Sequence, residues 1–206
     1  MVRIKICGIT NREDALLASS LGSDALGFIF AESERRVTPE DAREIIEELP
    51  PFIVKVGVFV NEEIERVEEI AEFLRLDVLQ FHGDEPPSYT QKFKRRVIKS
   101  FRVRDGDSLK AISDYKVSAY LLDTYSPGVY GGTGETFNWD LAIRAKEFGT
   151  IILAGGLNPD NVALAIQKVM PYAVDVSSGV ESSPGKKDPA RLAAFIQKVR
   201  KVEYQK

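Results

Sequence analysis

Cys7 is the sole cysteine of this 206-residue chain, and it ends an apolar run, residues 2–8, that reads as a strand followed by a glycine turn. A thiol at such a place is either a small buried hydrophobic group or a nucleophile and base directed into a site. Taken alone, the buried interpretation is favoured, because free cysteine is among the most buried residue types. The rest of the chain reverses this preference, because other reactive side chains recur at equivalent places.

Reactive side chains follow most of the other strand-like runs. They are Arg35 and Arg36, Gln80 and His82, Asp123, Gly155 and Gly156, and Asp175 with Ser177, Ser178 and Gly179. A thiol and a carboxyl group exchange protons, an arginine binds a planar carboxylate, and small residues let backbone N–H groups approach a phosphate. The set predicts acid–base chemistry on a phosphorylated substrate.

The elements that must position these residues alternate along the chain. We expect eight strands, at residues 3–7, 24–30, 53–59, 78–81, 97–101, 119–122, 151–154 and 173–176. Amphipathic helical patterns of about ten residues lie between them, as is typical of parallel strands joined by helical crossovers. Helix start signals are Thr10, Thr38 before Pro39, Asn61, Asn158 before Pro159, and Asp188 before Pro189.

Eight such units favour an α/β fold, a single compact (β/α)8 TIM barrel with parallel strands that spans residues 1–206 as one catalytic domain. The strands are continuously apolar, as strands buried on both faces should be. A doubly wound open sheet is the competing architecture, but it would not explain polar residues after so many strands. Active sites of such barrels lie where strands lead into the following helices.

The composition limits the partners and the compartment. The chain is 44% hydrophobic and 29% charged, with a net charge of −3, which is typical of a globular protein and argues against nucleic acid as a partner. Charges interrupt every apolar run, so we expect no membrane span. One cysteine permits no internal disulfide and favours the cytoplasm. The chain could be a monomer or a homodimer.

Six segments carry a resemblance to a known family. They lie at residues 5–10, 57–61, 80–83, 121–124, 154–157 and 175–181, and the match runs from residue 2 to about residue 191. In order and approximate spacing they resemble the phosphoribosylanthranilate isomerase family of tryptophan biosynthesis. The opening strand and the Asp-Val-Ser-Ser-Gly-Val-Glu segment are the most specific.

The resemblance implies an enzyme, an intramolecular oxidoreductase of the aldose–ketose isomerase type, that performs an Amadori rearrangement. It would convert a small phosphorylated aminoaldose, N-(5-phosphoribosyl)anthranilate, to 1-(2-carboxyphenylamino)-1-deoxyribulose 5-phosphate. By resemblance, Cys7 is the base and Asp123 the acid. Ordinary pKa values of about 8.5 for a thiol and about 3.9 for an aspartic acid suit neither role, so the barrel mouth would have to lower the first and raise the second.

The remaining site residues are also placed by resemblance. Arg35 would bind the anthranilate carboxylate, and Gln80, His82 and Asp175 would contact the substrate. Phosphate would bind at Gly155, Gly156, Ser177, Ser178 and Gly179. The loop before Arg35 is about one residue shorter than is usual in the family, which leaves Arg36 as a substitute; both arginines could instead form a solvated cluster with Glu32 and Glu34.

Three function classes stay open: this isomerase, another sugar-phosphate barrel enzyme such as a metal-dependent epimerase or a Schiff-base aldolase, and a non-catalytic sugar-phosphate binding barrel. A single histidine argues against a histidine-based metal site, so we expect no metal and no cofactor. Asp123 stands where an aldolase would need a lysine. A binding barrel would have no reason to combine Cys7 with Asp123. Finally, we interpret residues 131–134, Gly-Gly-Thr-Gly, as a loop that folds over the substrate.

Overall fold

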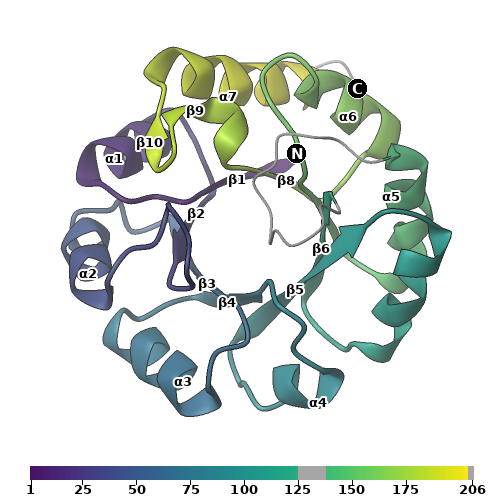
Figure 1. Ribbon diagram of the computed structural model, residues 1–206. Coiled ribbons are helices and arrows are strands. Elements are labelled where there is room, and N and C mark those ends of the chain that lie inside the picture. The colour runs from purple at the N-terminus through teal and green to yellow at the C-terminus, as the bar shows by residue number, and fades with distance from the viewer. Residues whose placement is uncertain (125–137, 204–206) are drawn as a thin grey trace.

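The computed structural model describes residues 1–124 and 138–203. Eight parallel strands pair in sequence order and close into a barrel, because β1 pairs with both β2 and β8 (Figure 1). The strands are β1 (Arg3–Cys7), β2 (Ala25–Ile29), β3 (Val54–Phe59), β4 (Val78–Phe81), β5 (Arg96–Val103), β6 (Ala119–Thr124), β7 (Ile151–Leu153) and β8 (Ala173–Val176). This confirms the predicted barrel and excludes the open sheet.

Helices surround the barrel (Figure 1). They are α1 (Arg12–Ser20), α2 (Pro39–Glu47), α3 (Ile64–Phe73), α4 (Pro87–Thr90), α5 (Trp139–Ala145), α6 (Val162–Val169) and α7 (Pro189–Glu203), with 3₁₀ helices η1 (Gly106–Asp114), η2 (Lys146–Phe148) and η3 (Ser178–Val180). The expectation of ten-residue helices throughout was wrong at two crossovers. After β4 there is a single turn, α4, and after β5 there is the 3₁₀ helix η1.

The predicted helix starts hold in part. Thr38 caps α2 by accepting a hydrogen bond from the backbone of Asp41, and α7 begins directly after Asp188. The N-cap of α1 is Asn11 rather than Thr10, whose hydroxyl donates instead to the carbonyl of Gly185. Thr10 does not cap the helix because its hydroxyl bonds to a residue that is distant in the sequence. The sequence alone does not reveal such a contact.

Side chains of the strands alternate between two cores. In β1, Ile4 and Ile6 point outward into the layer between barrel and helices. The alternate positions, Lys5 and Cys7, point into the barrel, whose apolar interior is formed by residues such as Leu121. Strand alternation therefore decides that Cys7 faces the barrel axis.

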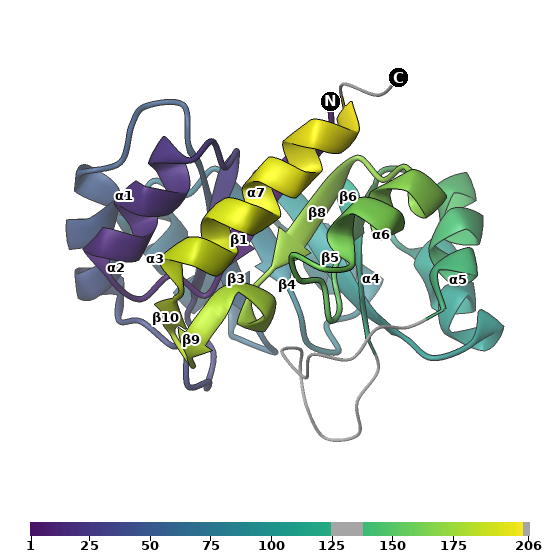
Figure 2. The ribbon, with the colours of Figure 1, turned by 90° about the horizontal axis from the view of Figure 1, so that it is seen from above.

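The two ends of the barrel differ. A short hairpin, β9 (Glu181–Ser183) and β10 (Lys186–Lys187), was not predicted and follows β8 and η3 at one end, whereas the N-terminus lies at the other (Figure 2). The segment at residues 131–134 that we interpreted as a loop over the substrate lies outside the described residues.

Candidate active site

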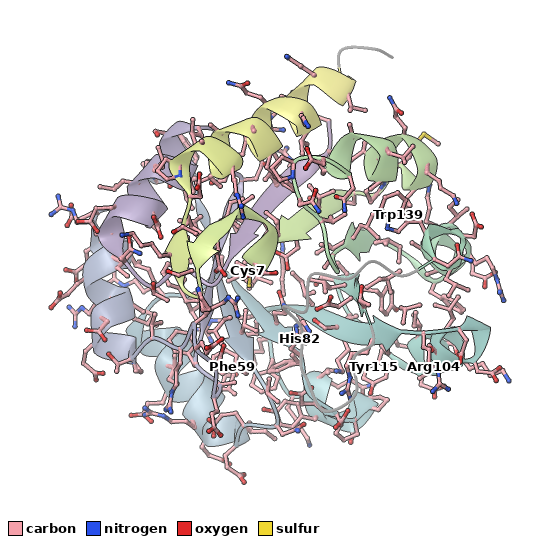
Figure 3. All side chains as sticks on the ribbon, turned by 45° about the horizontal axis from the view of Figure 1, so that its top comes forward. Cys7, Phe59, His82, Arg104, Tyr115 and Trp139 are labelled. Atoms are coloured by element: carbon pink, nitrogen blue, oxygen red, sulfur yellow. The ribbon has the colours of Figure 1, made fainter. Side chains whose placement is uncertain are left out.

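A cavity of about 700 Å³ lies at the carboxyl ends of the strands. Its lining includes eight of the residues singled out in the sequence: Cys7, Arg35, Arg36, Gln80, His82, Asp123, Asp175 and Ser177. Figure 3 shows Cys7 and His82 close to the centre of the barrel; Cys7 ends β1 and His82 follows β4. The topology thus collects reactive groups from across the chain into one cavity.

Cys7 ends β1 and is buried, with only 6% of its surface exposed. Burial raises the pKa of its thiol above the ordinary value, although the positive charges of Lys5 and Lys187 act in the opposite direction. The lowered thiol pKa that the role of Cys7 as a base would require is therefore not what the structure gives. Burial favours the protonated form of this thiol.

Asp123 faces the cavity from the end of β6, beside His82. Its Oδ2 lies 3.3 Å from Nε2 of His82, and its Oδ1 accepts a hydrogen bond from the backbone of Thr124. The amide of Gln80 lies 3.0 Å from Nδ1 of His82. An amide that donates there leaves the hydrogen of a neutral ring on Nε2, on the side of Asp123.

Arg35 is held by Glu181, the first residue of the hairpin. Its Nε and Nη2 donate to both carboxylate oxygens at 2.8–3.1 Å. Glu181 also accepts from the fully buried Lys187, whose Nζ donates in addition to the carbonyl of Cys7 at 2.6 Å. The alternative of a solvated cluster with Glu32 and Glu34 is not what Arg35 forms, because its hydrogen-bonded partner is Glu181. Arg36 lines the same cavity but is exposed.

Three polar atoms of the cavity lining are buried without a hydrogen-bond partner among the described residues. They are Oε1 of Gln80, Nε2 of His82 and Oγ of Ser177. The 3.3 Å separation between His82 and Asp123 is close enough for attraction but lacks the alignment of a hydrogen bond. Unpaired buried polar groups are costly, so their concentration here indicates a site for a polar ligand.

The predicted phosphate-binding residues form a second group beside the cavity, of which only Ser177 lines it. A Cβ at Gly179 would lie 1.9 Å from the carbonyl oxygen of Leu157, so the segment after β8 packs directly on the segment after β7. Gly155 has φ +78° and packs against Thr124 and Asp123 in the same way. Phosphate binding here stays a prediction, but the two segments do meet.

Sequence reasoning missed three charged residues of the site. Lys5 and Lys187 are 3% and 1% exposed, and Glu181 is buried between Arg35 and Lys187. A signal was present for Lys5, since a lysine in an apolar strand two residues before Cys7 must point the same way. No local signal marks Lys187, because its position depends on the folding of the hairpin against β1.

The arrangement suits proton transfer at two places on one bound molecule. A thiol and a carboxyl group project into one cavity from β1 and β6, which are not neighbours in the barrel. Arg35 and the unpaired polar atoms provide anchors around them. A substrate spanning this cavity would contact the thiol at one point and the carboxyl at another.

Comparisons with known proteins identify the family of the chain. Residues 4–198 match the family model described as N-(5'-phosphoribosyl)anthranilate (PRA) isomerase. The chain is 59% identical over 201 residues to the N-(5'-phosphoribosyl)anthranilate isomerase of Geobacter metallireducens, which covers 97% of this chain and 100% of that protein.

Two solved structures are also close. One holds monomers of the dimeric phosphoribosylanthranilate isomerase of Thermotoga maritima, with a TM-score of 0.89 and 42% identity. The other is a phosphoribosylanthranilate isomerase in complex with reduced 1-(o-carboxyphenylamino)-1-deoxyribulose 5-phosphate, with a TM-score of 0.89 and 43% identity. Each match covers 98% of this chain and 100% of that structure. The chain belongs to the N-(5'-phosphoribosyl)anthranilate isomerase family.

Proposed function

We propose that this chain converts N-(5-phosphoribosyl)anthranilate to 1-(2-carboxyphenylamino)-1-deoxyribulose 5-phosphate by an Amadori rearrangement, as a step of tryptophan biosynthesis. The observation that carries the proposal is the cavity itself, whose lining combines Cys7, Asp123 and Arg35. A binding protein would need the arginine but neither proton-transfer group. Because the reaction is an isomerisation with no net oxidation or reduction, the proposed mechanism uses no cofactor.

The proposed reaction has two stages. Asp123 donates a proton to the furanose ring oxygen, the C1–O bond breaks, and the nitrogen lone pair forms the C1–N imine. Cys7 then removes the proton on C2 as a thiolate, and the electron pair of that C–H bond moves toward the imine to give an enolamine. Transfer of the enol proton to C1 completes the ketone. The thiolate must first form from the buried thiol of Cys7, and burial opposes this step because it raises the pKa of the thiol.

Arg35 is proposed to bind the anthranilate carboxylate. Arg35 donates to Glu181 through Nε and Nη2. Its Nη1 donates no hydrogen bond to any of the described residues. A carboxylate can pair with the Nη1–Nη2 edge while Glu181 holds the Nε–Nη2 edge. In this proposal Glu181 fixes the plane of the guanidinium.

The sugar and phosphate complete the proposed pose. Asp175, Gln80 and His82 line the cavity and are proposed to contact the sugar. The phosphate would bind where the segments after β7 and β8 meet, at Gly155, Gly156, Ser177, Ser178 and Gly179. Ser177 supports this placement, because its hydroxyl is buried at the cavity wall without a partner in the described chain.

The test is turnover of the proposed substrate. Phosphoribosylanthranilate generated in situ should lose its anthranilate fluorescence on addition of the protein, at the same rate with and without a chelator. Absence of turnover would reject the isomerase, and binding without turnover would favour the sugar-phosphate binding barrel. Turnover that a chelator abolishes would reject the metal-free mechanism.

We further propose that the chain forms a homodimer through the N-terminal ends of its strands and works in the cytoplasm. A cavity of about 580 Å³ opens at those ends, and Phe52 and Tyr172 in its lining are 94% and 59% exposed. Exposed aromatic residues around an apolar cavity are typical of an interface. The dimeric Thermotoga maritima relative supports a second copy as the partner. None of the described helices is long and apolar enough to span a membrane.

A further inference from the structure

We propose that Lys5 is a positioning residue for the reaction, because its ammonium group provides the counter-charge that lets Cys7 act as a thiolate inside the barrel. The inference rests on the proposed function and adds to it the residue on which the base depends. We place Lys5 behind Cys7 and away from the substrate, since the cavity lining includes Cys7 but not Lys5.

The backbone places the two side chains together. Lys5 and Cys7 are two residues apart on β1 and share its inward face. In the barrel register, Lys5 lies opposite Asp175 of β8 and Cys7 lies opposite Gly27 of β2. A charged residue and the thiol therefore stack in successive layers of the barrel, with a glycine beside them.

Gly27 makes the contact possible. A Cβ at this position would lie 2.9 Å from Sγ of Cys7 and 3.2 Å from Nζ of Lys5. Both atoms thus occupy the space that a side chain at position 27 would fill. The backbone of Gly27 is not in the left-handed region, so its absent side chain rather than its conformational freedom is what the site uses.

Lys5 is charged in this setting. Burial by itself would lower the pKa of its ammonium, but Asp175, at 2.9 Å, and Cys7 together raise it. An ammonium has three hydrogens, and Asp175 uses one of them. The others are available to the sulfur, so Lys5 can hold Asp175 and a thiolate at the same time.

Other ionisable groups also lie around Cys7, on several elements. They are Asp175 on β8, Lys187 on β10, Arg35 after β2, His82 after β4 and Asp123 on β6. The Nζ of Lys187 already donates to the Cys7 carbonyl and to Glu181, and Arg35 donates to Glu181. Among the groups that lower the pKa of Cys7, Lys5 has the largest influence, and its Nζ shares with the sulfur the space beside Gly27.

The sole cysteine of the chain gives a direct measurement. The rate at which iodoacetamide alkylates Cys7 follows the fraction of Cys7 that is thiolate. The pH dependence of this rate therefore gives the titration midpoint of the thiol, the pH at which half of it is deprotonated, and no substrate is needed. We expect Lys5→Met to raise this midpoint by at least one pH unit relative to the unmodified protein. The kcat at pH 7 should fall about tenfold or more, with KM changed far less and kcat partly recovered at alkaline pH.

The matched control is Lys99→Met. Lys99 is 2% exposed and pairs with the buried Glu85, so it resembles Lys5 in burial and partner, but it lies on β5 rather than on β1. The Lys99→Met substitution should leave the titration midpoint of the Cys7 thiol unchanged. A Lys5→Met protein with an unchanged midpoint would overturn the proposal, even if its activity were low.

Lys5→Met leaves Asp175 as a buried unpaired charge, which could prevent folding. The comparison is then between Asp175→Asn and the double variant with Lys5→Met, because neither contains that unpaired carboxylate. The midpoint should be higher in the double variant, and equal midpoints would reject the role of Lys5. Since alkylation needs no turnover, this result is separate from a failure of the isomerase assay.

Discussion

At the scale of single residues, the site places a buried thiol and a carboxyl group in one cavity without activating the thiol in the resting protein. Burial dominates the pKa of Cys7, and the nearby lysines only partly offset it. The proposed role of Cys7 requires its thiol to lose a proton during the catalytic cycle, so we expect the rate to depend on how well the site supports the thiolate. The proton-transfer roles can be tested separately from binding.

We expect Cys7→Ala and Asp123→Asn each to lower kcat by about 10² or more, the usual scale of general acid–base catalysis. Each removes one proton-transfer group while Arg35 and the segments after β7 and β8 remain to bind the substrate, so KM should change little. Steady-state kinetics of the folded variants measures both. Near-normal kcat in either variant would remove that residue from the mechanism.

The two neighbouring arginines differ in their surroundings, and their variants should differ as well. Arg35 is fixed by Glu181, whereas Arg36 is exposed. Arg35→Met should raise KM, with a loss of about 1.5–3 kcal/mol in binding, as expected for a hydrogen-bonded charge, and Arg36→Met should do little. A raised KM in Arg36→Met with an unchanged KM in Arg35→Met would reverse the assignment. An unchanged KM in both variants would mean that the carboxylate is bound elsewhere.

At the scale of elements, the site depends on contacts between segments that follow different strands. The β9–β10 hairpin brings Glu181 and Lys187 to the end of β1, where they hold Arg35 and the carbonyl of Cys7. The backbone of Lys187 is in turn bonded to Asp14 of α1. The proposed carboxylate anchor, Arg35, and the backbone of the proposed base, Cys7, thus share a single support.

The contact between the segments after β7 and β8 gives a prediction at this scale. Gly179→Ala would place a methyl group 1.9 Å from the carbonyl oxygen of Leu157, so one segment must move. We expect KM to rise at least tenfold, because the proposed phosphate site would lose its geometry, whereas kcat falls less. Gly106→Ala is the control, since its methyl group would meet only the end of the Arg144 side chain. Equal kinetics of both variants would argue against a phosphate site at this contact.

At the scale of the whole molecule, the barrel separates two tasks. The carboxyl ends of the strands form the candidate active site, and the N-terminal ends carry the exposed aromatic residues. A surface at the N-terminal ends can bind a second copy without covering the active site. Catalysis and assembly therefore place separate demands on the sequence.

We expect light scattering to give twice the chain mass of 22.9 kDa, and Phe52→Asp to give the single-chain mass. A charge at a side chain that is 94% exposed should leave the fold intact, but it would be buried unpaired in the proposed interface. Leu164→Asp is the control, because Leu164 is also exposed but lies on α6, outside that cavity lining. A monomeric parent protein, or a dimeric Phe52 variant, would contradict the proposed interface.

The sequence by itself determined the barrel and the residues that face its mouth. Strand and helix patterns are local, and in parallel strands local alternation decides that Cys7 and Asp123 face the axis. The resemblance then supplied the proposed reaction. Strand ends were less well predicted: β5 extends two residues beyond the predicted Phe101, because pairing with a neighbouring strand decides where a strand ends.

Only the tertiary structure decided the electrostatics of the site. The partner of Arg35 is Glu181 rather than its neighbours in sequence, and Lys187 reaches the carbonyl of Cys7 across 180 residues of chain. The pKa of Cys7 is raised because burial, a property of the whole barrel, outweighs the charges nearby. Such contacts depend on long-range folding and desolvation, and neither is encoded in the spacing of residues along the chain.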